Sequence, residues 1–154
     1  MDAEINLEEH YALLRAKFGD VGLTAEEQLA VAGEFINIAF DLKRPVDLRQ
    51  AIEFMRNISR PDLPPGGTAF LDYCIGGAFA NLGILEHYAE EVPLQWNSDS
   101  WEQRLKHLRC AVRNEDDFVA LAPRQQCCIL NNLGTALNAT GGSSMRSKFG
   151  IDCY

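Results

Sequence analysis

Apolar side chains recur along most of the chain at intervals of three and four residues, with polar residues between them. Near the N-terminus, for example, Leu7, Tyr11, Leu14 and Phe18 share one face of a helix that is predicted to begin at about Ala3. No run of alternating apolar and polar residues is long enough to predict a strand. The pattern therefore predicts an all-α fold.

Glycines, prolines and capping residues divide this helical pattern into segments. Thr24 and Glu27 form a capping box that opens a helix, and Ser100 to Gln103 is predicted to be a second capping box. The strongest break is 59–67, which contains three prolines and two glycines. We expect one all-helical domain over 1–154, made of an N-terminal helix (1–22), a first hairpin (24–60), a second hairpin (68–113), and a final helix with a C-terminal tail (123–154).

The charge of the chain narrows the classes of partner. Fourteen Lys and Arg residues against 22 Asp and Glu residues give the 154 residues a formal net charge of −8. Phosphate backbones and anionic membrane surfaces repel such a chain, so nucleic-acid and membrane partners are not expected. The apolar window from Thr68 to Leu85 contains Asp72 and Asn81, and we interpret it as a buried helix.

Five cysteines without a C-x-x-C motif are typical of a reduced, cytoplasmic protein. The residues from Met1 to Glu4 carry no basic region with an apolar run behind it, which also favours the cytoplasm. Cys127 and Cys128 point in directions about 100° apart on a helix. We therefore expect one of them in the core and the other nearer the surface.

A glycine-centred pattern recurs in two of the predicted helices. Residues 74–83 and 132–141 align without a gap, with an apolar residue before Gly76 and before Gly134, a large apolar residue three positions after each, and a closing glycine. A small residue between large ones allows the backbone of a neighbouring helix to approach closely.

This pattern resembles the first helix of a tetratricopeptide repeat (TPR). The strongest copy consists of Leu130, Leu133, Gly134, Leu137 and Gly141. The second copy consists of Ile75, Gly76, Phe79 and Gly83, and it has Asp72 where a large apolar residue is expected. The weakest copy consists of Leu29, Ala32, Gly33, Ile36 and Phe40. The intervals between the central glycines exceed the usual repeat of about 34 residues, which linker insertions would explain. The resemblance implies antiparallel helical hairpins stacked as a short TPR-like right-handed array over about 24–141.

The resemblance also implies a groove lined by the first helices of the hairpins, where this family commonly binds peptides or partner proteins. The groove-facing positions are Glu34, Asn37, Tyr73, Asn81, Asn131, Thr135 and Asn138. Asparagine offers both donors and an acceptor, so it can bond the backbone of an extended peptide without requiring a charge. The lysine and arginine pairs with which some family members hold a C-terminal carboxylate are not found at these positions, so an acidic ligand is not favoured. We expect a protein-binding scaffold with no cofactor and no catalytic activity.

Two other functions compete with this hypothesis. A small helical enzyme or metal-binding protein could use His87, which has glutamates at helical spacing, or His107 with Cys110 one turn later. Charge mixtures such as the one around His87 are routine on solvated helix faces. No second ligand pair at suitable spacing accompanies His107 and Cys110. No metal site and no catalytic set are therefore predicted. Gly66 to Thr68, at a predicted helix N-terminus, could bind an anion, although the sequence lacks the longer phosphate-loop motif.

The second competing function is self-association. After Gly141 there are too few residues for a further full helix, so the last helix of the array would lack a partner. A short helix that contains Met145, Phe149, Ile151 and Tyr154 would cover its open face. Otherwise that face is buried in a homodimer, or the chain is the front end of a longer array.

Overall fold

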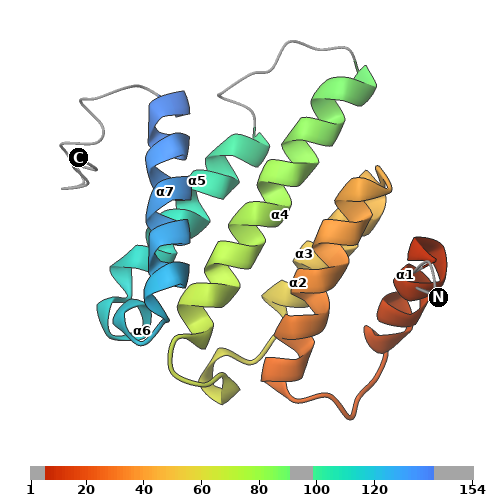
Figure 1. Ribbon diagram of the computed structural model, residues 1–154, viewed down its shortest axis with the longest axis horizontal. Helices are drawn as coiled ribbons and strands as arrows, with labels where there is room; N and C mark the ends of the chain where they lie inside the picture. Colours follow the sequence, from red (N-terminus) through yellow and green to blue (C-terminus); the bar gives the residue numbers. More distant parts are fainter. Residues whose placement is uncertain (1–5, 91–98, 141–154) are drawn as a thin grey trace, which may run out of the picture.

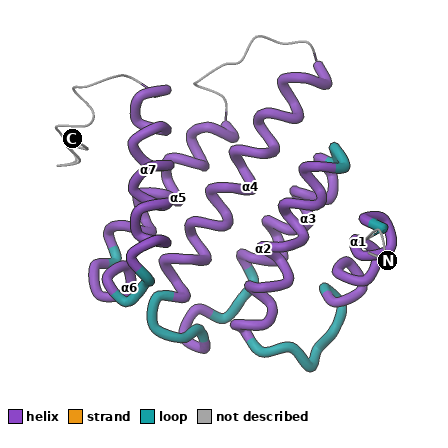
Figure 2. Tube along the Cα trace, viewed as in Figure 1, coloured by secondary structure: helices purple, strands orange, loops and turns teal. Residues whose placement is uncertain are grey.

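The computed structural model describes residues 6–90 and 99–140, and these are almost entirely helical, with no strand among them (Figure 2). The all-α prediction is therefore confirmed. The elements in chain order are α1 (Leu7–Lys17), α2 (Ala25–Asp41), α3 (Pro45–Arg56), a short 3-10 helix η1 (Arg60–Asp62), α4 (Gly67–Glu90), α5 (Asp99–Arg113), α6 (Glu115–Val119) and α7 (Pro123–Thr140).

The long helices lie in a row that follows the chain, from α1 at the right of Figure 1 to α7 at the left. Helices α2, α4 and α7 run in one direction and α3 and α5 run in the other (Figure 1). Each helix from α1 to α5 packs on the next one, α7 packs on α5, and α2 also contacts α4. The long helix α4 therefore packs on α2 and α3 on one side and on α5 on the other.

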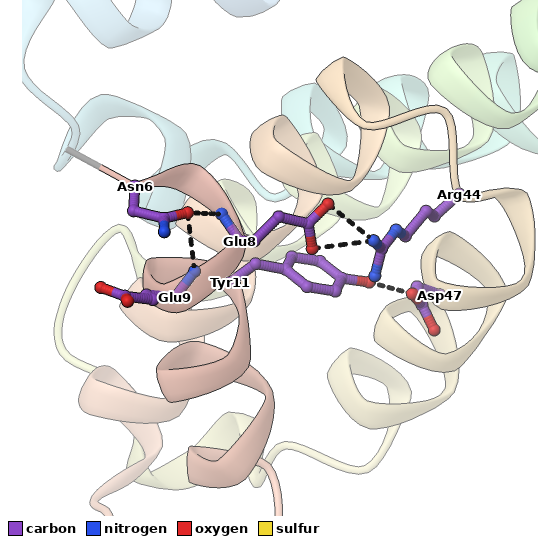
Figure 3. A network of polar contacts seen from close by, with 6 residues as sticks. All are labelled: Asn6, Glu8, Glu9, Tyr11, Arg44 and Asp47. Carbon is purple, nitrogen blue, oxygen red and sulfur yellow. Dashed lines mark hydrogen bonds and ion pairs between the residues drawn. The ribbon is translucent and has the colours of Figure 1, made fainter. Parts of the chain in front are cut away.

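The first helix is fixed to α2 and α3 by buried aromatic rings and by a polar network. Tyr11 stacks on Phe35 with ring centroids 4.8 Å apart, and its hydroxyl donates to the buried carboxylate of Asp47 (Figure 3). One guanidinium nitrogen of Arg44 lies 2.9 Å from both carboxylate oxygens of Glu8, and the same guanidinium covers the ring of Tyr11 (Figure 3). These contacts join α1 to the start of α3.

Local signals place several helix ends where the sequence predicts them. The amide of Glu27 donates to the hydroxyl of Thr24 over 3.2 Å, so the first capping box is confirmed. Helix α7 begins at Pro123, since a proline lacks the amide hydrogen that a first helical residue leaves unpaired anyway. The side chain of Asn6 caps α1, while the predicted start of that helix at Ala3 lies outside the described residues.

The N-terminus of α4 receives an anion from the chain itself. Asp117 in α6 accepts hydrogen bonds from the amides of Gly66 (2.9 Å) and Ala69 (2.6 Å). Gly66 has a φ of +87°, and a Cβ there would come within 2.9 Å of the Leu121 side chain, so this turn requires glycine. The carboxylate of Asp117 thus occupies the anion-binding position considered at 66–68. The positive end of the α4 dipole stabilises its negative charge there.

Helix α4 passes through the middle of the row with residues such as Leu71 and Ile75 fully buried. Within the described residues it contains one stretch, Gly67–His87, that is long and apolar enough to cross a membrane by length and composition alone. Just over half of that window, 56%, is buried inside the protein. Packing against other helices accounts for its apolar character, as expected for this stretch.

Two predictions from the sequence are wrong. Helix α5 already includes Asp99, so Ser100 is a buried residue inside the helix and does not cap it. Cys127 and Cys128 are both exposed, because the neighbouring Ile129 and Leu133 carry the contact of α7 with the core.

The exposed face of α7 is polar. Asn131, Thr135 and Asn138 lie on it together with both cysteines. Such a face gives little apolar area for the predicted homodimer to bury. The covering segment predicted from Met145 to Ile151 lies outside the described residues.

Candidate peptide-binding groove

A hollow of about 600 Å³ lies between α2 and α4 and extends to one residue of α7. Its lining is Leu29, Ala30, Gly33, Glu34, Ile36 and Asn37 from α2; Phe70, Tyr73, Cys74, Gly77, Ala80 and Asn81 from α4; and Asn132 from α7. We call this hollow the groove. Glu34 is the only charged residue in this lining.

Four of the seven predicted groove residues line it together. They are Glu34 and Asn37 from α2 with Tyr73 and Asn81 from α4, which the sequence separates by more than thirty positions. The remaining three, Asn131, Thr135 and Asn138, are exposed on the outer face of α7. Asn132 is the α7 residue that reaches the groove instead.

The register of α7 explains this difference. Positions 131, 135 and 138 share one helix face because they are four and three residues apart. Leu133 and Leu137, which are almost fully buried, turn the opposite face toward α4 and α5. The alignment of Gly76 with Gly134 therefore predicted the buried positions of α7 correctly. It did not predict which exposed residues of α7 face the groove.

Small residues keep the groove open. Ala30, Gly33, Gly77 and Ala80 replace side chains that would otherwise fill the space between α2 and α4. A Cβ added at Gly77 would have no atom within 4 Å, and one at Gly33 would meet only the Cys74 sulfur at 4.0 Å. Neither glycine has a positive φ, so neither close packing nor backbone conformation requires glycine at these two positions.

Gly76 differs from its neighbour Gly77 in this respect. A Cβ at Gly76 would lie 3.3 Å from the backbone oxygen of Arg104 and 3.5 Å from Leu108 Cγ in α5. Gly83 likewise faces Ser100 at 3.3 Å. The glycines of the second TPR-like copy therefore mark the crossing of α4 with α5, whereas Gly33 of the weakest copy faces the groove.

Several polar groups of the groove have no internal partner. The side chains of Asn37, Tyr73 and Asn81 make no hydrogen bond to any residue that the structure describes. Asn132, in contrast, donates to the backbone oxygen of Cys128 over 2.8 Å. Glu34 lies at the rim with one oxygen 2.6 Å from His10 Nε2. The unpaired amides and hydroxyl are thus available to a bound molecule.

The floor of the groove is chemically inert. Burial raises the pKa of the Cys74 thiol to about 12, so it is protonated and a poor nucleophile at neutral pH. Burial, followed by the neighbouring Cys128 and Cys74, raises the pKa of the Tyr73 hydroxyl, which stays neutral and can donate a hydrogen bond. Tyr73 thus offers a hydrogen-bond donor, and Cys74 offers no thiolate.

Sequence reasoning missed the role of Asp72. This residue stands at an apolar position of the TPR-like pattern and is 5% exposed. Both of its oxygens accept from Arg60 at 3.0 Å, and His107 Nδ1 donates to one of them at 3.1 Å. Burial by itself would raise the pKa of Asp72, but the hydrogen bonds from His107 and Arg60 hold it below its usual value. A charged residue at a core position, close after an arginine in a proline-rich turn, is the signal that could have revealed this pair.

The predicted alternatives for metal binding or catalysis are placed as follows. His107 has its Nδ1 occupied by Asp72, so it does not present both ring nitrogens. Beside His87, Glu86 pairs with Arg49 of α3, while the Glu90 side chain and Glu91 lie outside what the structure describes. No group of three or more His, Cys, Asp or Glu side chains among residues 6–87 and 99–138 is arranged to hold a metal ion.

A second hollow, of about 550 Å³, lies between α3, α4 and the start of α5. Five of its nine lining residues are charged: Arg49, Glu53, Arg56, Glu86 and Asp99. Arg49 pairs with Glu86, and Arg56 pairs with Glu53 at 3.3 Å and lies over the Phe79 ring. Because four of these five charges are already paired with one another, this hollow is a weaker binding candidate than the groove.

No protein-family model, no curated protein and no solved structure matches the chain.

Proposed function

We propose that this protein is a helical-repeat module that binds an extended peptide segment of a partner protein in the groove between α2 and α4. Gly77 is the observation that carries the proposal. A glycine in the middle of a helix costs about 1 kcal/mol relative to alanine. No contact within 4 Å compensates for it, so its benefit is best explained by the space that it leaves for a ligand.

The unpaired polar groups support a peptide as the ligand. Asn37 and Asn81 lie on opposite sides of the groove, and each can donate to a peptide carbonyl and accept from a peptide amide. An extended chain leaves such groups unpaired along its whole length. An anionic small molecule fits less well, because the lining contains no lysine or arginine.

We further propose a TPR-like arrangement of the hairpins. The pairs α2 with α3 and α4 with α5 are antiparallel, and α2, α4 and α7, the first helices of this arrangement, share one direction (Figure 1). The close approach of α5 at Gly76 supports the assignment of the second pair. The first pair departs from the pattern, because Gly33 does not lie against α3.

Two asparagines provide a matched test of the proposal. The purified chain is used to select peptides from a random display library, and the affinity of a selected peptide is then measured by fluorescence anisotropy. Asn81→Lys places a long cation in the groove and is expected to weaken binding at least tenfold. Asn138→Lys makes the same change on the exposed face of α7 and should leave the affinity within twofold.

Failure of the library to yield any specific peptide would contradict the proposal. So would equal effects of the two lysine substitutions, provided that circular dichroism shows both variants to be folded.

A further inference from the structure

A smaller hollow of about 290 Å³ adjoins the groove. Leu29, Ala30 and Phe70 line both spaces, so the two are continuous along α2 and α4. The smaller hollow adds an apolar end in which Leu121 and two prolines of the 59–67 turn face Phe70. An extended peptide that enters beside Asn81 can therefore continue toward the N-terminus of α4.

Every charge on this continuous surface is negative. Glu34 lines the groove and Glu26 lines the smaller hollow, and no lysine or arginine lines either space. His10 lies 2.6 Å from Oε1 of Glu34, while Oε2 makes no contact of this kind with the described residues. Glu34 thus retains an acceptor for a cationic donor of the ligand.

The positions of these residues set a spacing for the ligand. Glu34 and Ala30, which lines both spaces, are four residues apart on one face of α2, which is about 6 Å along the helix axis. Two residues of an extended chain cover about 7 Å, and side chains two positions apart project to the same side. We infer that the groove selects an extended peptide with a lysine or arginine two positions from a large apolar residue, the cation at Glu34 and the apolar side chain against Leu29, Phe70 and Leu121. This inference rests on the proposed function.

The library selection described above tests the spacing directly. Enriched peptides are expected to carry a basic residue two positions from Leu, Ile, Met or Phe. Ala30 lies where the two spaces meet and is exposed, so Ala30→Trp should block the junction and weaken a selected peptide at least tenfold. Replacing the apolar residue of the peptide by alanine should weaken binding to the wild-type protein by a similar factor. The same replacement should have little effect on binding to the Ala30→Trp variant.

The electrostatic half of the inference is tested by a double-mutant cycle. Glu34→Gln is expected to weaken a selected peptide about tenfold, and Glu102→Gln, at an exposed site on α5, should leave it unchanged. Changing the basic residue of the peptide to neutral norleucine should weaken binding to wild type by a similar factor. The same peptide change should have little effect on the Glu34→Gln variant.

The outcomes separate the inference from the proposed function. Selected peptides that lack the basic residue, with affinity sensitive to Asn81→Lys and insensitive to Glu34→Gln, would overturn the inference and leave the groove as the peptide site. A second copy of the chain that competes with the peptides for the groove would also overturn it. If no peptide is selected, both the inference and the proposed function fail.

Discussion

The two faces of α4 differ most clearly at two consecutive glycines. Gly76 faces α5, where the backbone of Arg104 would lie 3.3 Å from any added Cβ. Gly77 faces the groove, where an added Cβ would touch nothing within 4 Å. Packing therefore requires glycine on the face of α4 toward α5 but does not explain it on the face toward the groove. The first face builds the fold, and the second leaves open space.

Polar groups follow the same division. On the face toward α5, Asp72 is saturated by Arg60 and His107. On the face toward α2, Asn81 and Tyr73 have no hydrogen-bond partner in the described part of the chain. The polar groups toward α5 are thus paired within the protein, whereas those toward α2 are open to a ligand or to water.

The largest expected effect is on the face toward α5. Asp72→Ala leaves His107 and Arg60 without their carboxylate, and we expect the free energy of unfolding to fall by about 3 kcal/mol. This value is the lower end of the range for breaking a buried ion pair, because Arg60 is partly exposed. Urea denaturation followed by circular dichroism measures this change. Asp62→Ala, at an exposed position of η1, is the control and should change stability by less than about 0.5 kcal/mol. A loss below about 1 kcal/mol for Asp72→Ala would show that the contacts of Asp72 with Arg60 and His107 do not hold η1 and α5 to α4.

A smaller loss is expected for Gly76→Ala. The added methyl group meets the backbone oxygen of Arg104, which can move only if α5 moves. Overpacking of this kind costs about 1–3 kcal/mol, and the better helix propensity of alanine offsets part of it. We therefore expect a net loss of about 1.5 kcal/mol in the same denaturation assay. Unchanged or increased stability would mean that α4 and α5 do not approach as closely as described.

A still smaller effect is expected from pH. The pKa of Asp72 is lower in the folded protein than the value of about 3.9 typical of an unfolded chain. Its carboxylate therefore stabilises the fold fully above that value, and this contribution is lost as the pH falls toward the folded pKa. The free energy of unfolding, measured by urea denaturation at pH 6 and at pH 3, should fall more between these two pH values for wild type than for Asp72→Ala. Equal falls would exclude Asp72 as a source of the acid sensitivity.

Sequence reasoning succeeded where the determining signal is local. The helix capped by Thr24, the helix that begins at Pro123 and the break at 59–67 each depend on residues within one turn of the boundary. The sequence also predicted that Glu34, Asn37, Tyr73 and Asn81 face one groove, and all four line the same hollow.

It failed where contacts between distant segments decide. Asp117 caps α4 from about fifty residues away, and Asp72 is neutralised by residues of η1 and α5. On α7, a rotation by one residue places Asn132 in the groove in place of Asn131. Neither a hydrophobic period nor a capping motif contains information of that kind.

The most direct test of the account is Gly77→Ala, measured for stability and for peptide affinity in the same preparation. Because the added methyl group meets nothing and alanine favours the helix, the free energy of unfolding should rise by about 0.5–1 kcal/mol. Because the methyl group occupies the groove, the affinity for a selected peptide should fall several-fold. A variant that is less stable, or that is more stable and binds the peptide as tightly as wild type, would contradict the claim that Gly77 is present to keep the groove open.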